Sequence, residues 1–348
     1  IMTAFHNILV IRTDRIGDVI LTTPSVRALR RAFPRARLTL LVSPRTRELV
    51  EGNPDIDQIL VDDRQGAHRG FWGCVALIRL LREQHFDLAV NFHTKKRTNA
   101  LCFFAGIPRR LGYRNEKLGF LLTDQVTDDR HEGQKHEARY CLDLLSGLRV
   151  AGVPLKTHVS VQEDNERWAG KFFEGHHLTA VRVIAVHPGA SCPTKKWPAK
   201  RFAEVINALA ARDKAAFLLV GGAGADDRAT ADSVLAAVHN PVLDMTGRTS
   251  VGQLASLLKR CHLLISNDSG PVHIADGLGV PVISIFTRNQ PGINPERWRP
   301  LGEQAQTVVT PFEGKKSFCK SNVPDPEYLD LIPVQAVLQA VDAVFKLC

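Results

Sequence analysis

The sequence predicts an α/β protein with two parallel-sheet domains, and three observations indicate this. Short apolar runs alternate with helical patterns, as they do where helices connect parallel strands. The 348 residues exceed one ordinary hydrophobic core. The alternation also restarts after Pro154. We therefore expect one domain over residues 1–164, a second domain over 165–332, and a helix at 333–348 that returns to the first domain.

The first half begins with a buried strand and an amphipathic helix. The strand covers Asn7 to Arg12, and apolar residues at helical spacing follow to Phe33. The zone from His93 to Lys117 has seven Lys/Arg against one Glu, and we expect it to be rich in loops. The remaining expectations are strands at 37–42, 56–61 and 86–92, helices at 71–83 and from Gly133 to about 151, and a connection over 152–164.

The second half repeats the pattern, and its most informative stretch is ISNDSGPVHIADGLGVPVISIFT, from Ile265 to Thr287. It reads as a buried strand, a turn, a helix with proline in its first turn, and another buried strand. Such a helix start is a natural anion site. The other expected elements are strands at 183–188, 216–221, 242–247 and 262–267, and helices at 200–212, 227–238, 250–259 and 334–345.

Composition excludes several classes of protein. The net charge is +9, which suits an anionic membrane or a phosphorylated substrate, while no recognition motif for nucleic acid occurs. The seven cysteines never form a CxxC pair, and no HExxH spacing exists, so we expect reduced thiols and no metal. Without a signal-peptide pattern or a run of about 18 apolar residues, a cytoplasmic protein is expected.

Candidate chemistry lies in the turns that follow the strands, because ligands of open α/β sheets bind there. No turn has the GxGxxG or GxxxxGK[ST] pattern, which argues against NAD enzymes and P-loop NTPases. Lys195, Lys196 and His273 remain, beside turns whose N–H groups suit a diphosphate.

Two of these turns have a purely structural alternative. Asp18 would act as a general base, or it would only stabilise the start of its helix. Asp268 or Ser269 would contact a ligand, or would only cap the helix at Pro271.

The chain resembles the bacterial lipopolysaccharide heptosyltransferases, glycosyltransferase family 9. The resemblance spans nearly the whole chain and rests on the order and spacing of five stretches: RTDRIGDVILTTPSVRALR, FFAGIPRRLGYR, VHPGASCPTKKWPAKRF, GGAGADDR and NDSGPVHIADGLGVPVISIF. FFAGIPRRLGYR favours the branch that adds the second heptose. Two departures are Asp14-Arg15 before Gly17, where small hydroxyl residues are common, and Thr287-Arg288-Asn289 where glycine is usual.

The resemblance implies a GT-B fold, with two Rossmann-like domains at a central cleft, and inverting, metal-independent transfer of L-glycero-D-manno-heptose from ADP-heptose to an inner-core lipopolysaccharide hydroxyl. Asp18 matches the catalytic carboxylate, and no cofactor is implied. The second domain would bind the nucleotide-sugar donor, through the following residues: Gly189, Ser191, Lys195, Asp226, Asp227, Thr246, Asp268, Ser269, Gly270 and His273.

The acceptor would be a lipid A-core glycolipid, and Lys95, Lys96 and Arg97 lie where its anionic groups would bind. The same zone could instead be a solvated loop. We expect a peripheral protein at the inner face of the cytoplasmic membrane. Two alternatives stay open: a GT-B enzyme for another nucleotide sugar, and a non-catalytic protein that binds nucleotide sugars or glycolipid.

Overall fold

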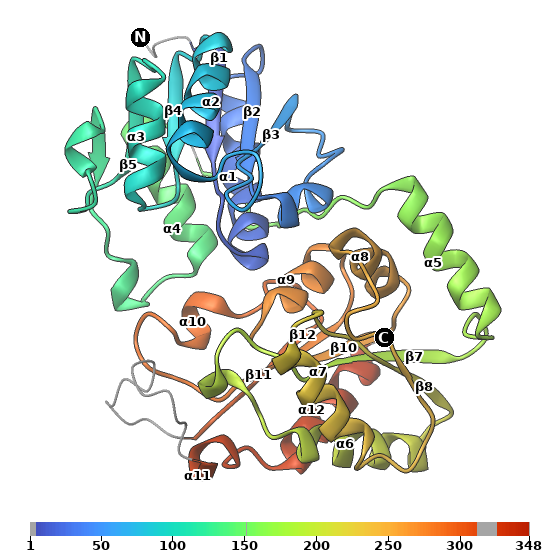
Figure 1. Cartoon of the computed structure of the whole chain (residues 1–348). Coiled ribbons are helices and arrows are strands. Elements are labelled where there is room, and N and C mark those ends of the chain that lie inside the picture. Colours follow the sequence, from blue (N-terminus) through green and yellow to red (C-terminus); the bar gives the residue numbers. More distant parts are fainter. Residues whose placement is uncertain (1–4, 151, 312–325, 348) are drawn as a thin grey trace. The chain divides into compact units, whose positions relative to one another are not determined.

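The structure is a computed structural model that describes residues 5–150, 152–311 and 326–347. The chain divides into two compact units. Unit 1 comprises Ile1–His131 and Lys135–Ser160, and unit 2 comprises Glu132–Gln134 and Val161–Cys348. Each unit is built on a six-stranded parallel sheet with helices packed against it (Figure 1). The α/β class and the two parallel sheets expected from the sequence are confirmed.

The sheet of unit 1 has the strand order β3-β2-β1-β4-β5-β6, and every neighbouring pair is parallel. Its central strands are short apolar runs, as expected for strands that are covered on both faces. The strands are β1 (Asn7–Ile11), β2 (Arg37–Val42), β3 (Gln58–Val61), β4 (Leu88–Asn91), β5 (Arg109–Tyr113) and β6 (Asp124–Val126).

Four helices cover the two faces of this sheet. Ile8 and Val10 of β1 pack in a core with α1 (Ile16–Ala32) and α4 (Glu137–Leu144). Leu9 and Ile11, which point to the opposite face, pack in a core with α2 (Gly70–Glu83) and α3 (Lys96–Phe104). Therefore α2 and α3 lie on the same face and share one solvent side.

The basic zone from His93 to Lys117 is not the loop-rich segment that we expected. It contains α3 and β5, which extend the sheet beyond β4. Charged side chains conceal β5 in the sequence. Arg109 at the start of β5 pairs with Asp124 of β6 at 2.9 Å and is only partly exposed. The expected helix after Gly133 is also shorter, since α4 ends at Leu144 and a 3-10 turn follows to Leu148.

The sheet of unit 2 has the order β12-β11-β10-β7-β8-β9, again with parallel pairs. Its strands are β7 (Arg182–His187), β8 (Ala215–Leu219), β9 (Val242–Asp244), β10 (Leu263–Asn267), β11 (Val282–Phe286) and β12 (Ala305–Val309). Its helices are α5 (Glu163–Gly175), α6 (Ala199–Arg212), α7 (Ala225–Leu235), α8 (Val251–Lys259), α9 (Gly270–Gly277), α10 (Pro295–Trp298), α11 (Pro326–Leu329) and α12 (Val334–Leu347).

The expectation that the last helix returns to the first domain is wrong. Val337, Val341 and Val344 of α12 are fully buried in the core of unit 2, together with Phe202 of α6 and Ile283 of β11. The helix has one apolar stripe, and the sheet of its own unit offers the apolar face that buries it. The division between the units falls after Ser160, close to the expected boundary after residue 164.

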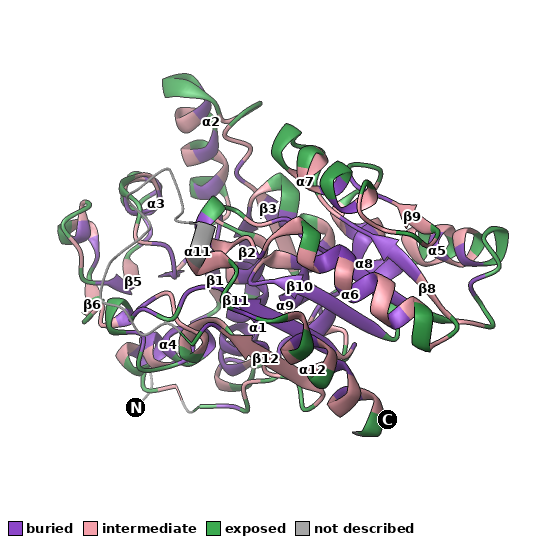
Figure 2. Cartoon of the chain, turned by 90° about the horizontal axis from the view of Figure 1, so that it is seen from below, coloured by how far each residue is buried: buried purple, intermediate pink, exposed green. Residues whose placement is uncertain are grey.

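In each unit the strand order reverses beside the first strand in sequence. The reversal lies between β1 and β4 in unit 1 and between β7 and β10 in unit 2. These strands lie at the buried centres of their sheets (Figure 2). Since connections leave in opposite directions from such a switch point, the loops beyond the carboxyl ends of these four strands define the expected ligand sites.

Candidate active site

The switch point of unit 1 contains a buried arginine that is shared by three carboxylates. Arg12, the residue after β1, is 2% exposed. Its Nη2 donates to Asp18 Oδ1 at 2.5 Å and to Glu137 Oε1 at 3.1 Å, and its Nε donates to Asp14 Oδ1 at 2.9 Å. Its Nη1 donates to the carbonyl of Phe92, the residue after β4. Arg12 therefore joins both sides of the switch point and fixes the carboxylate of Asp18.

Asp18 does not cap its helix. Arg15 occupies the N-cap position of α1 without a side-chain cap bond, and the Asp18 carboxylate points to Arg12 instead. Burial raises the pKa of Asp18, and the nearby charges of Asp14 and Glu137 add to this against the opposing effect of Arg12. A carboxylate with a raised pKa accepts a proton more readily, which suits a general base.

A neutral histidine lies on the opposite side of this cluster. His93, just after β4, has Nδ1 at 3.3 Å from the Thr13 hydroxyl and Nε2 at 3.9 Å from Asp14 Oδ2. Burial lowers its pKa to about 3, helped by the positive charges of Arg12 and Arg64. The imidazole therefore stays uncharged at neutral pH and can only serve as a hydrogen-bonding group there.

The three residues proposed for the acceptor differ in their surroundings. Arg97 donates from Nε and Nη2 to both oxygens of Asp62, at 3.0 and 2.8 Å, and Asp62 is fully buried. This bidentate pair occupies the guanidinium and gives Arg97 a structural role. Lys95 and Lys96, at the start of α3, are exposed and face solvent. Contact of all three with an anionic acceptor stays a prediction, and the two lysines are the more exposed.

The switch point of unit 2 is centred on a lysine and carboxylate pair. Lys195 follows β7 in a 3-10 turn, and its Nζ lies 2.5 Å from Asp268 Oδ2 and 3.3 Å from the Asp268 carbonyl. Asp268 follows β10, so the pair connects the loops of the two strands that flank the switch point. The Asp268 carboxylate thus holds the ammonium of Lys195 in place, and it does not cap α9.

Ser269 occupies the N-cap position of α9 without capping it through its side chain. Its hydroxyl lies 3.0 Å from His187 Nδ1 and 3.0 Å from the hydroxyl of Ser266. Burial lowers the pKa of His187 to about 4, with a further contribution from Lys196. His187 is therefore neutral at pH 7 and supports the turn through its contact with Ser269. Gly270 is the first residue of α9, and His273 is buried in the same helix.

Asn267, the last residue of β10, holds the loop after β7 through its side-chain amide. Its Nδ2 donates to the carbonyl of Pro188 at 2.7 Å, and its Oδ1 accepts from the N–H of Trp197 at 3.0 Å. The ring of Trp197 packs edge-on against Phe202, with their centroids 5.0 Å apart. This buried amide sets the spacing between the turn that contains Gly189 and the turn that contains Lys195.

The two adjacent aspartates of the glycine-rich turn have different environments. Asp226 is exposed and pairs with Lys196 Nζ at 2.5 Å. Asp227 is closely packed against glycines, because a Cβ added at Gly189 or at Gly222 would collide with its carboxylate. Burial raises the pKa of Asp227, and the charge of Asp226 adds to the shift. Asp227 therefore lies beside the turn after β7, whereas Asp226 lies at the surface.

Two further candidates in unit 2 also follow strands. Thr246, after β9, is 6% exposed, and its Oγ1 has no hydrogen-bond partner among the described residues. Ser191 is exposed in the loop between Gly189 and Lys195. The Ser191 side chain is thus open to a ligand, whereas Thr246 offers a buried hydroxyl.

Neither a metal-ligand cluster nor a membrane-spanning helix is found in the part of the chain that the structure describes. No group of three or more His, Cys, Asp or Glu residues there could hold a metal ion. No helix there is both long and apolar enough to cross a bilayer. Cys319, Lys315, Lys316 and Lys320 lie outside the described residues.

Comparison with known proteins decides the family. A model of glycosyltransferase family 9 (heptosyltransferase) matches residues 74–326. The chain belongs to glycosyltransferase family 9. It is 25% identical to lipopolysaccharide heptosyltransferase 2 of Escherichia coli, in an alignment that covers 97% of this chain and 98% of the relative. It is also 25% identical to lipopolysaccharide heptosyltransferase 3 of Escherichia coli, over 94% of each chain.

Solved structures show the same fold. A family-9 glycosyltransferase from Veillonella parvula matches with a TM-score of 0.89 at 26% identity, over 100% of this chain and 99% of the other. ADP-heptose lipopolysaccharide heptosyltransferase II of Escherichia coli matches with a TM-score of 0.78 at 23% identity, over 97% and 98% of the two chains. The chain is thus a glycosyltransferase, and its two Rossmann-like units have the GT-B fold.

Three site residues of this family-9 glycosyltransferase were missed at the sequence level. Arg12 read as the last residue of a strand, Glu137 as part of a helix, and Asn267 as part of a turn. Two sequence signals pointed to a role: Arg12 is a charged residue at the end of an apolar run, and Asn267 lies directly beside Asp268. Nothing local points to Glu137, which meets Arg12 across 125 positions of the sequence.

Proposed function

We propose that this enzyme transfers L-glycero-D-manno-heptose from ADP-heptose to an inner-core hydroxyl of a lipopolysaccharide acceptor, with inversion and without a metal ion or cofactor. The observation that carries the proposal is the complementary chemistry of the two switch points. Unit 1 has a fixed carboxylate with a raised pKa, and unit 2 has a fixed ammonium beside a helix start. A base and an anion site are the two groups that such a transfer requires.

The reaction would be one displacement. The acceptor oxygen bonds to the anomeric carbon while the bond from that carbon to the diphosphate oxygen breaks, and the proton of the hydroxyl passes to Asp18. A single displacement inverts the configuration. Arg12 positions the Asp18 carboxylate but takes no proton, because an arginine stays charged.

The leaving ADP develops negative charge in the transition state. Lys195, positioned by Asp268, and the N–H groups at the start of α9 would stabilise that charge more strongly there than in the bound donor. Fixed positive groups of this kind can replace the metal ion that other nucleotide-sugar enzymes use. Ser191, Thr246 and Asp227 would contact the remaining parts of the donor.

The choice of donor and acceptor rests on the relatives. Two related proteins are named lipopolysaccharide heptosyltransferases, and the Escherichia coli heptosyltransferase WaaC has been solved with ADP, at 15% identity and a TM-score of 0.72. We extend these substrates to this chain, with Lys95 and Lys96 at the anionic acceptor. The enzyme would act as a peripheral protein at the inner face of the cytoplasmic membrane.

Purified enzyme tests the proposal with ADP-heptose and a heptose-deficient core acceptor. ADP release and a product that is one heptose heavier are expected, and EDTA should leave the rate unchanged. Calorimetry with ADP, GDP and UDP tests the donor independently. Binding of UDP or GDP without binding of ADP would overturn the heptose assignment in favour of another nucleotide sugar.

A further inference from the structure

Unit 1 displays large aromatic side chains to solvent on the outer side of its α2 and α3 layer. Five residues there, Phe71, Trp72, Phe103, Phe104 and Phe120, are between 43% and 77% exposed. We call them the aromatic surface. Among the described residues of unit 2, Leu331 is the one large apolar side chain that is comparably exposed. Exposed apolar groups concentrated in this way mark an interaction surface.

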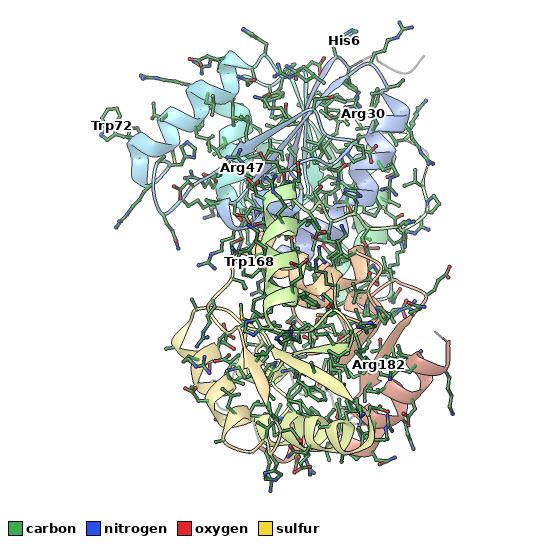
Figure 3. The ribbon with its side chains drawn as sticks, turned by 90° about the vertical axis from the view of Figure 1, so that its right-hand side faces the viewer. His6, Arg30, Arg47, Trp72, Trp168 and Arg182 are labelled. Carbon is green, nitrogen blue, oxygen red and sulfur yellow. The ribbon has the colours of Figure 1, made fainter. Side chains whose placement is uncertain are left out.

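The rings form two pairs at the two ends of α2. Phe71 and Trp72 lie in its first turn, with ring centroids 5.3 Å apart. Phe103 and Phe104 end α3, also 5.3 Å apart, and Arg82 near the end of α2 donates to the Phe104 carbonyl. A helix of this length spans about 20 Å, so the pairs suit a wide, flat partner. Figure 3 shows Trp72 pointing away from the body of unit 1, and Figure 2 shows the same end of α2 exposed.

Phe120 belongs to the same side of the unit. Asn99 of α3 donates to the carbonyls of Lys117 and Leu118, which holds the turn containing Phe120 against α3. The guanidinium of Arg110 lies over the Phe103 ring at 5.5 Å from its centroid and donates to the Leu121 carbonyl. An arginine therefore lies between the ring at the end of α3 and the turn of Phe120.

The surroundings of the aromatic surface are basic. Residues 69–117 contain ten Lys/Arg against three Asp/Glu, a net charge of +7 in a chain whose total is +9. Exposed side chains account for most of the positive charge, namely Arg69, Arg79, Arg82, Lys95, Lys96, Arg114 and Lys117. Self-association through this surface would bring like charges together. A flat partner with a negatively charged surface and an apolar interior would complement both the positive charge and the exposed rings.

We propose that the aromatic surface docks unit 1 onto an anionic phospholipid bilayer, with the rings inserted at the headgroup level and the basic side chains on the lipid phosphates. Aromatic rings favour the boundary between water and acyl chains, and Lys and Arg near a membrane add electrostatic attraction. The inference deepens the peripheral membrane location given under the proposed function, and it rests on that function only for the claim that the acceptor is a glycolipid.

Co-sedimentation of the full chain with vesicles tests this surface. Binding is expected to vesicles of phosphatidylcholine with phosphatidylglycerol, to weaken with salt, and to be lost with phosphatidylcholine alone. The double variant Phe71→Ala/Trp72→Ala should bind about 100-fold more weakly, since two rings leave the interface. Arg69→Gln/Arg79→Gln should bind about 25-fold more weakly, at roughly fivefold for each charge.

Matched substitutions in unit 2 serve as controls. Leu331→Ala removes an exposed apolar group and Lys171→Gln removes an exposed charge, and both should bind vesicles as the wild type does. If the first pair of rings proves necessary for folding, Phe103→Ala/Phe104→Ala tests the second pair. Unchanged vesicle binding of the aromatic variants would overturn the proposal. So would a wild-type dimer that Phe71→Ala/Trp72→Ala converts to a monomer.

Activity assays separate this inference from the proposed function. With a deacylated, water-soluble acceptor, Phe71→Ala/Trp72→Ala should retain wild-type kcat and KM. With the acceptor embedded in anionic vesicles, its KM should rise. The protein could bind vesicles through the rings and yet transfer no heptose. That result would support the membrane surface and overturn the proposed function.

Discussion

The two switch points share an architecture and differ in their charge. In unit 1 one buried guanidinium serves three carboxylates, those of Asp14, Asp18 and Glu137. In unit 2 one ammonium, on Lys195, meets one carboxylate, and neutral groups from Asn267, Ser269 and His187 complete the surroundings. The parallel sheet therefore determines where each site lies, and under the proposed function the charge balance suits one site to proton uptake and the other to anion binding.

Asp18→Asn tests the proposed base of unit 1, and its expected effect is the largest. Without a base, kcat should fall by about 10²- to 10⁴-fold, because the acceptor proton has no recipient. ADP affinity should stay at the wild-type value, since the variant leaves unit 2 intact. Single-turnover rates and calorimetry measure the two quantities. Wild-type turnover in the variant would remove the mechanism, and a wild-type protein that binds ADP but never transfers sugar would support the non-catalytic alternative.

Lys195→Gln tests the proposed anion site of unit 2 by removing its ammonium group. Loss of a charge-assisted bond to the diphosphate should weaken ADP binding by about 10- to 150-fold, equivalent to about 1.5–3 kcal/mol. Lys196→Gln is the matched control, since its ammonium pairs with the exposed Asp226. That variant should change ADP affinity less than about fivefold. Equal effects of the two substitutions would mean that general positive charge, and not the ammonium fixed by Asp268, binds the donor.

Asn267→Ala tests how unit 2 holds its two loops together. It would leave the Trp197 N–H and the Pro188 carbonyl buried without partners, at a cost of about 1–3 kcal/mol for each group. Asn267→Asp keeps the acceptor for Trp197 but sets a buried carboxylate oxygen against the Pro188 carbonyl, so it should destabilise the protein at least as much as alanine does. Urea unfolding measures both variants. An alanine variant as stable as the wild type would show that the loops do not depend on this amide.

The pH dependence of stability tests the raised pKa of Asp18. The raised pKa of Asp18 means that the folded state favours its protonated form, so this group stabilises the protein below its unfolded pKa of about 3.9 and loses that contribution as pH rises through the folded value. Asp18→Asn should therefore melt at or above the wild-type temperature at pH 7, and the difference should vanish in acid.

The catalytic rate should rise with pH, whereas the contribution of Asp18 to stability falls with pH. kcat/KM should fall as pH drops through the raised pKa of Asp18, which must be ionised to act as a base. No step near pH 6.5 is expected from His93 or His187, because their pKa values are lowered to about 3 and about 4. A step near pH 6.5 that disappears in His93→Gln would contradict the neutral histidine.

Sequence reasoning recovered most of what depends on local pattern. The run NILVI produced β1, the strand 37–42 was located residue for residue, and each strand end indicated where a site should lie. It could not recover what depends on distant partners. The residues around Arg97 give no sign that its guanidinium bonds to Asp62, which lies 35 positions earlier. The C-terminal helix carried an apolar stripe, but that stripe does not say which sheet buries it.

The smallest expected effect is that of Thr246→Val. This substitution tests whether a buried hydroxyl of unit 2 belongs to the donor site. Thr246→Val keeps the shape and removes an Oγ1 that has no partner among the described residues, so stability should be unchanged or higher by up to about 1 kcal/mol. ADP should bind about two- to tenfold more weakly if the hydroxyl contacts the donor. Ser256→Ala, in α8 of the same unit, removes another buried hydroxyl without a described partner and should change neither quantity. Wild-type ADP affinity in Thr246→Val would remove the turn after β9 from the donor site and confine that site to the loops that flank β7 and β10.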